Sequence, residues 1–172
     1  MVKLSELLAL PIAEASGADR MNFPHSHPHF GTGPQSKDAD VVLVLDAVAP
    51  FIPGHQSPKP DARIAWIGPD PVQSRYKTME FRADLWIPAS VAPTLRAISE
   101  AACKLLDASD LSRIEERRER LLARKQQIWA QLEAQIADDA RSGKITGRLV
   151  AHELGRILNP ETVLLNDAIS NG

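Results

Sequence analysis

Three histidines at alternate positions are the first residues whose types and spacing could do chemistry. His25, His27 and His29 form an H-x-H-x-H run. In an extended chain alternate side chains face the same way, so three imidazoles could together ligate a metal ion. No acid or cysteine stands beside them at ligand spacing. We therefore expect loop histidines and predict no metal site.

Cysteines and glycine-rich motifs provide no further evidence for a functional site. Cys103 is the only cysteine, which excludes a disulfide within the chain and favours a cytoplasmic location. It lies in an apolar helical stretch, so we expect it to be a small buried hydrophobe. The glycine-rich fingerprint G-x-G-x-x-G of dinucleotide-binding proteins does not occur.

Composition excludes several classes of partner. The chain has 172 residues, 44% of them hydrophobic, and a formal net charge of −2. This length suits one domain or one and a half, and the balanced charge gives no reason to expect nucleic acid as a partner. No apolar run reaches the roughly 18 residues that a membrane span needs, and the N-terminus does not look like a signal peptide. We expect a protein without a nucleic-acid or membrane partner.

Apolar runs predict an α/β fold. Val41–Leu45 is continuously apolar, as in a strand covered on both faces. Strands are also expected at Arg63–Ile67 and Asp84–Ile87, and Ser90 can cap a helix from Val91 to about Leu106. Proline-rich segments separate the strands. This order indicates a doubly wound parallel sheet.

Further helices are expected on either side of these strands. The first covers Leu4 to Leu10 and is ended by Pro11. A long polar helix runs from Leu111 to about Ser142, with Asp110 as its cap and Gly143 after its end. Its buried side is predicted to carry the apolar residues Ile114, Leu121, Ile128, Leu132 and Ile136. The charged face is expected to be solvated, because the heptads needed for a coiled coil fail around Lys125 and Gln126.

The pattern restarts after Gly143. Thr146 can cap a helix that Asn159-Pro160 ends, and a strand is expected at Val163–Leu165. One helix and one strand cannot bury a core by themselves. We therefore expect this last part to belong to a second α/β domain that continues beyond residue 172.

The order of these segments resembles the thiamine-diphosphate enzymes of the acetolactate synthase and benzoylformate decarboxylase group. The stretch 22–28 is similar to the group's N-F-P-x-x-H-P segment, and 39–45 to its A-D-x-V-L-x-x-G strand. The stretches 49–53 and 61–71 are similar to the P-W-x-P loop and the A-R-I-I-x-I-D-x-D-P strand and turn. The stretch 83–87 is similar to the A-D-L-x-I strand, and 146–171 to the opening helix and strand of the C-terminal domain.

This resemblance implies a fragment of a larger enzyme. Residues 1–107 would be a truncated, Rossmann-like middle domain, 108–145 a long linker helix, and 146–172 the start of the cofactor-binding C-terminal domain. The parent would be a lyase or carboligase that uses thiamine diphosphate and Mg²⁺ on a small-molecule substrate. The activating glutamate and the G-D-G…N metal motif of the family have no counterpart here, so we expect this chain alone to bind no cofactor and to be inactive.

Two positions depart from the family's pattern. Flavin-binding members have a glycine after the first of these strands, where this chain has Asp46. A carboxylate there would repel a pyrophosphate, which argues against bound FAD. The first of two usual acids after the next strand is Gly68, and the second, Asp70, remains as a contact for an adenine ribose or as a simple turn residue.

The resemblance also suggests site residues. His55 would stand near the active-site histidine of benzoylformate decarboxylase and act as a general acid or base; the alternative is an exposed loop histidine. Phe51 takes the place of the family's tryptophan and would line the substrate pocket. Asp167 would approach the cofactor or substrate, or else cap a helix.

Two other functions stay open. The chain could be a stand-alone module that binds an adenine nucleotide, or a structural domain that drives oligomerisation. An unpaired sheet edge favours self-association, so we expect a homo-oligomer.

Overall fold

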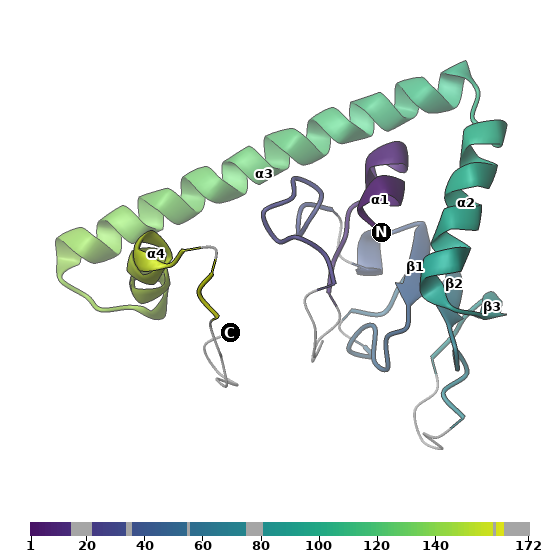
Figure 1. The fold of residues 1–172 in the computed structure, drawn as a ribbon, viewed down its shortest axis with the longest axis horizontal. Coiled ribbons are helices and arrows are strands. Elements are labelled where there is room, and N and C mark those ends of the chain that lie inside the picture. Colours follow the sequence, from purple (N-terminus) through teal and green to yellow (C-terminus); the bar gives the residue numbers. More distant parts are fainter. Residues whose placement is uncertain (15–21, 34–35, 55, 75–80, 160, 164–172) are drawn as a thin grey trace. The chain divides into compact units, whose positions relative to one another are not determined.

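The computed structural model describes residues 1–14, 22–33, 36–54, 56–74, 81–159 and 161–163. Within these ranges the chain has an α/β fold, with a three-stranded parallel sheet and four α-helices (Figure 1). The chain divides into two compact units, residues 1–125 and 126–172. The predicted boundaries near 107 and 145 remain predictions.

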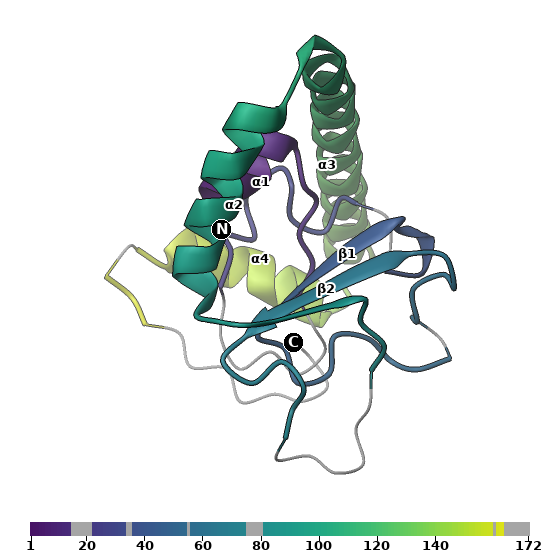
Figure 2. The same cartoon turned by 90° about the vertical axis from the view of Figure 1, so that its right-hand side faces the viewer.

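The three expected strands form one sheet in chain order. β1 (Val41–Leu45), β2 (Arg63–Gly68) and β3 (Leu85–Pro88) are hydrogen-bonded in the order β1-β2-β3, and both pairs are parallel. Figure 2 shows β1 and β2 side by side. No helix separates the strands in the described residues 46–54, 56–62 and 69–74, where prolines interrupt the chain.

The central strand β2 has the most buried side chains. Ile64 and Trp66 point to one face and pack with Val44, Phe51 and Phe81. Ile67 alternates to the other face, where α2 (Val91–Leu105) contacts the strand. Burial on both faces, which we predicted for the first strand, therefore applies best to β2.

The first two helices differ in detail from the prediction. α1 spans Val2–Leu8 and ends at Ala9, whose φ of 48° is left-handed, so the helix stops before Pro11 is reached. In α2, Leu95 is buried, but Cys103 is exposed and Leu105 is 79% exposed. The prediction of a buried Cys103 is wrong because, at 100° per residue, both positions lie about 80° from Leu95 on the helical wheel.

The long helix α3 spans Ala108–Ser142. Its cap is Asp107, not Asp110: the Asp107 carboxylate accepts the Asp110 N–H at 2.9 Å, and the Asp110 carboxylate lies 3.4 Å from the Asp107 N–H. This reciprocal arrangement is a capping box, in which the expected cap residue is the third helical residue. Ile114 and Leu121 are buried as predicted, whereas Ile128, Leu132 and Ile136 are only half-buried.

Three cations on the first half of α3 bind backbone carbonyls of residues 1–33. Arg117 donates to the carbonyls of Leu8 and Ala9 at 2.6 and 3.0 Å, and Arg118 donates to that of Glu6. Lys125 donates to His25 and Phe30. The heptad pattern fails at Lys125 because this side chain binds polar backbone groups.

Residues 126–172 form the second unit, described up to 159 and over 161–163. Gly143 follows α3 at φ 68°, with the Lys144 N–H donating to the carbonyl of Asp139 at 3.2 Å, as in a Schellman cap. α4 spans Gly147–Ile157, and the Thr146 hydroxyl accepts the Leu149 N–H, as predicted.

The end of the described chain is irregular. Val163 lies in no strand and is exposed, while the other residues of the predicted strand 163–165 lie outside the described residues. Among the helices of the described residues, none is long and apolar enough to cross a membrane.

Candidate functional site

The carboxyl edge of the parallel sheet brings together the ends of three strands. Leu45 pairs with Ile67, and Gly68 pairs with Pro88, so all three strands end at one level. In open parallel sheets this edge is where ligands bind. The residues that follow the strands are therefore the candidates for a site.

Asp46 follows β1 in a strained backbone conformation. Its φ is 46°, in the left-handed region that non-glycine residues rarely adopt, and its N–H donates to the carbonyl of Ile67 at 2.8 Å. A Cβ built on Gly68 would lie 3.1 Å from Asp46 Oδ1 and 3.4 Å from Asp46 Cα. The missing side chain at Gly68 thus leaves room for the Asp46 carboxylate.

Gln73 links the segments that follow β1 and β2. It is 8% exposed and has a left-handed φ of 52°. Its Nε2 donates to the carbonyls of Ala47 and Val48 at 3.0 and 2.5 Å, while its Oε1 is buried and has no partner among the described residues. A buried acceptor without a donor costs about 1–3 kcal/mol. No sequence signal pointed to Gln73, because an isolated glutamine in a loop forms part of no pattern.

Asp70 forms a turn on the same segment. Its exposed carboxylate accepts the Ser74 N–H at 2.9 Å and the Ser74 hydroxyl at 2.8 Å. This is the turn chemistry that we gave as the alternative to a ribose contact. The ribose contact stays a prediction.

Phe51 belongs to the apolar core. It is buried, and its ring meets that of Phe81 edge-to-face at 5.2 Å, while Trp66 lies 5.8 Å from Phe81. These contacts account for the position of Phe51 without a substrate, so its role in a pocket remains a prediction. His55 and Asp167 lie outside the described residues.

A buried serine–histidine pair in the N-terminal segment resembles a catalytic nucleophile and base. Its hydrogen bond, however, runs in the direction that does not allow the histidine to act as the base. Ser5 Oγ lies 2.8 Å from His29 Nδ1 and also donates to the carbonyl of Leu10 at 2.8 Å. Because the single hydroxyl proton goes to that carbonyl, Nδ1 must carry its own proton and donate to Ser5. His29 therefore cannot take a proton from Ser5 through this bond, and the pair anchors the segment.

The other two histidines have separate partners. His25 Nε2 lies 3.0 Å from Glu14 and its ring stacks on Phe30, while His27 Nε2 lies 3.5 Å from Glu6. The His27 Nδ1 accepts the N–H of His29 at 3.1 Å. The alternate spacing thus serves three different contacts.

The described residues contain no group of three or more His, Cys, Asp or Glu side chains that could hold a metal ion. At the sheet edge the Asp46 carboxylate is an oxygen acceptor that suits a ligand donating hydrogen bonds, and Gln73 Oε1, after β2, is a second acceptor that is buried. Comparison of the chain with family models, curated proteins and solved structures gave no match.

Proposed function

We propose that this chain supplies the middle domain of a thiamine-diphosphate- and Mg²⁺-dependent lyase or carboligase. One observation carries the proposal. The three stretches that resemble consecutive strands of that family cover β1, β2 and all but the last residue of β3, and these strands pair in parallel in the same order. Sequential parallel order is what one half of a doubly wound, Rossmann-like sheet requires.

The two departures from the family's pattern also support the proposal, because they are neighbours in space. An acid replaces glycine at Asp46, a glycine replaces an acid at Gly68, and the two residues are in contact. The carboxylate that is missing at Gly68 is thus replaced by one at the end of β1, in addition to the second acid, Asp70. We infer that the two departures, at Asp46 and Gly68, compensate for each other.

The cofactor, when bound in the whole enzyme, supplies an ylid that attacks a carbonyl and then accepts electrons. The donor set described here does not fit thiamine diphosphate or Mg²⁺, since it holds no candidate metal cluster. The sequence also contains no G-D-G motif. We therefore assign no catalytic step to this chain, and propose that His55 and Asp167 act only in the larger enzyme.

The test is a thermal-shift panel on the purified chain, with thiamine diphosphate plus Mg²⁺, FAD, ADP and coenzyme A. We expect no shift with thiamine diphosphate plus Mg²⁺ and no decarboxylation of pyruvate or benzoylformate. Decarboxylase activity, or a rise in melting temperature with thiamine diphosphate plus Mg²⁺, would contradict the proposal that this chain alone is inactive and does not bind the cofactor.

A second experiment tests the exchange itself. Gly68→Asp should destabilise the chain, because the new Cβ and carboxylate crowd Asp46. The double variant Asp46→Gly, Gly68→Asp should recover most of the lost stability in urea unfolding. Additive losses in the double variant would count against the family assignment.

A stand-alone nucleotide-binding module is the second candidate, and the unpartnered Gln73 Oε1 favours it. A ribose hydroxyl could donate to this atom or to Asp46. Under this reading ADP at 100 times its Kd should stabilise the chain by roughly 2.7 kcal/mol. Asp46→Asn and Gln73→Leu should reduce that shift, and Asp61→Asn, an exposed acid, should leave it unchanged.

Self-association is proposed through the sheet edges. β1 and β3 each pair with one strand within the described residues, and Leu85 and Trp86 on β3 are partly exposed. Light scattering on the purified chain should therefore detect an oligomer; a monomer at all concentrations would exclude it.

A further inference from the structure

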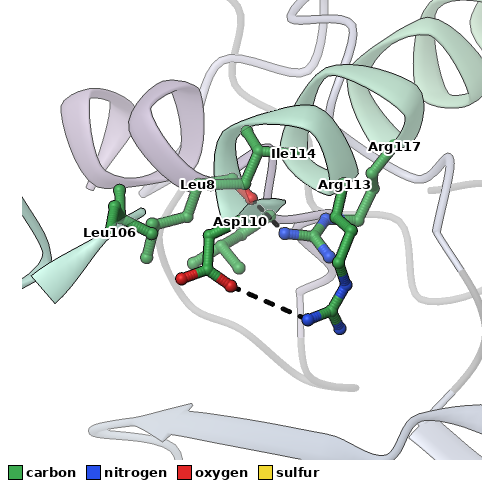
Figure 3. A pocket seen from close by; sticks show the side chains of 7 residues that line it. Leu8, Leu106, Asp110, Arg113, Ile114 and Arg117 are labelled. Carbon is green, nitrogen blue, oxygen red and sulfur yellow. Dashed lines mark hydrogen bonds and ion pairs between the residues drawn. The ribbon is translucent and has the colours of Figure 1, made fainter. Parts of the chain in front are cut away.

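An open cavity of about 160 Å³, lined by four apolar and three charged side chains, lies where the ends of α1 and α2 meet the first turns of α3 (Figure 3). Leu8, Leu10, Leu106 and Ile114 form its apolar walls. A dry protein cavity of about 150 Å³ accommodates benzene, so this one has room for about six carbon atoms. All of its lining residues belong to the unit 1–125.

The rim of the cavity is cationic. Arg113 and Arg117, one turn apart on α3, stand there with a single carboxylate, Asp110 (Figure 3). Arg113 Nη1 lies 3.7 Å from Asp110 Oδ1 in an exposed ion pair. Among the residues that line the cavity, two guanidinium groups and one carboxylate leave one positive charge beside the apolar walls.

Arg117 is the less exposed of the two cations. Its Nε and Nη2 donate to backbone carbonyls, and it takes part in none of the ion pairs found among the described residues. Burial, together with the nearby Arg113 and Arg120, lowers the pKa of Arg117, while the carboxylate of Asp40 opposes this shift. Three of its five N–H donors are not used in these carbonyl bonds. A partly desolvated cation of this kind favours an anion close by.

We propose that this cavity binds a short aliphatic carboxylate. The hydrocarbon tail lies against Leu8, Leu106 and Ile114, and the carboxylate pairs with Arg113 and the remaining donors of Arg117. A small inorganic anion would leave the apolar walls uncovered, and a neutral chain would leave the charge uncompensated. This site is separate from the sheet edge and independent of the proposed function.

The experiment is a titration of the 172-residue chain with hexanoate, followed by calorimetry and by methyl NMR. We expect saturable binding with shifts at the methyl groups of Leu8 and Ile114. 1-Hexanol should bind at least about fivefold more weakly, because it cannot form charge-assisted hydrogen bonds. Arg113→Gln should weaken hexanoate binding about fivefold, whereas Arg124→Gln, an exposed arginine further along α3, should not change it.

Asp110→Asn gives a test of opposite sign. It removes the carboxylate that competes for Arg113 while keeping an oxygen for the capping box, so hexanoate should bind about twofold more tightly or better. Far-UV circular dichroism checks that each variant is folded. The proposal is overturned by the absence of saturable binding, by equal affinity for hexanoate and hexanol, or by methyl shifts confined to other residues.

Discussion

Different interactions stabilise the interior of each of the two units of this chain. Residues 1–125 contain all the buried apolar side chains of the described chain, and these include one cluster around Trp66 and another around Ile114 and Leu121. Among residues 126–159 and 161–163 the one buried residue is Asp139, and Ile145 and Ile157 are largely exposed. The first unit rests on apolar burial, and the second on hydrogen bonds.

Asp139 is the centre of the second unit. Its Oδ2 accepts the Thr146 hydroxyl at 2.7 Å and the Arg148 Nε at 2.9 Å, and its carbonyl accepts the N–H of Lys144. A buried large apolar side chain contributes about 1.5–3 kcal/mol, whereas a typical hydrogen bond contributes about 0.5–1.5 kcal/mol. The difference predicts that the second unit is the less stable of the two.

The largest expected effect comes from the core of the first unit. Trp66→Ala should lower the free energy of unfolding by about 3–5 kcal/mol, because it leaves a cavity beside Phe81. Urea unfolding followed by circular dichroism measures it. Trp129→Ala, in the second unit, is the matched control and should cost about 1 kcal/mol or less. Equal losses would remove the contrast between the units.

The next effect concerns the contacts between α3 and the N-terminal segment. Arg117→Met removes the donors to the carbonyls of Leu8 and Ala9 and should cost about 1–2 kcal/mol. Arg120→Met, an exposed arginine one turn on, should be close to neutral. If the two variants unfold at the same urea concentration, these hydrogen bonds do not stabilise the first unit.

A smaller effect should appear as a pH dependence of the first unit. Burial, followed by the positive charges of His27 and Arg118, lowers the pKa of His29 below 6.5, although Glu6 opposes the shift. Below pH 6.5 the unfolded chain takes up a proton that the folded chain refuses, so stability falls as the pH drops from 6.5 to the lowered pKa. Urea unfolding at pH 7.5 and 5 should show this loss, and His29→Gln should reduce it. His152→Gln, an exposed histidine in the second unit, should not.

The smallest effect should be confined to the second unit. Hydrogen bonding by Thr146 and then Arg148 lowers the pKa of Asp139, against the opposing effect of burial. The stabilisation is present above the ordinary aspartate pKa, near 3.8, and is lost as the pH falls through the lower folded value. Carboxyl ¹³C NMR should show Asp139 titrating below the ordinary aspartate pKa. In Asp139→Asn the amide signals of α4 should lose helical shifts while those of β2 stay unchanged.

Local sequence patterns predicted the positions of helices and strands better than they predicted which side chains are buried. The apolar runs placed the strands within about one residue, and Thr146 and Gly143 marked helix ends correctly. Burial was harder: Cys103 lies in an apolar stretch yet is exposed, because the part of α2 that touches the sheet is decided by packing. The sheet edge likewise depends on register, since Asp46, Gly68 and Gln73 come from separate segments.

The sequence by itself determined where strands and helices form, because backbone propensity, capping and apolar periodicity act over a few residues. It also carried the resemblance from which the family proposal follows. Only the tertiary structure decided that the apolar cores belong to one unit, that cations of α3 bind the N-terminal carbonyls, and that His29 donates to Ser5. These contacts join residues up to about a hundred positions apart, and their energies depend on burial and distance, which no local pattern specifies.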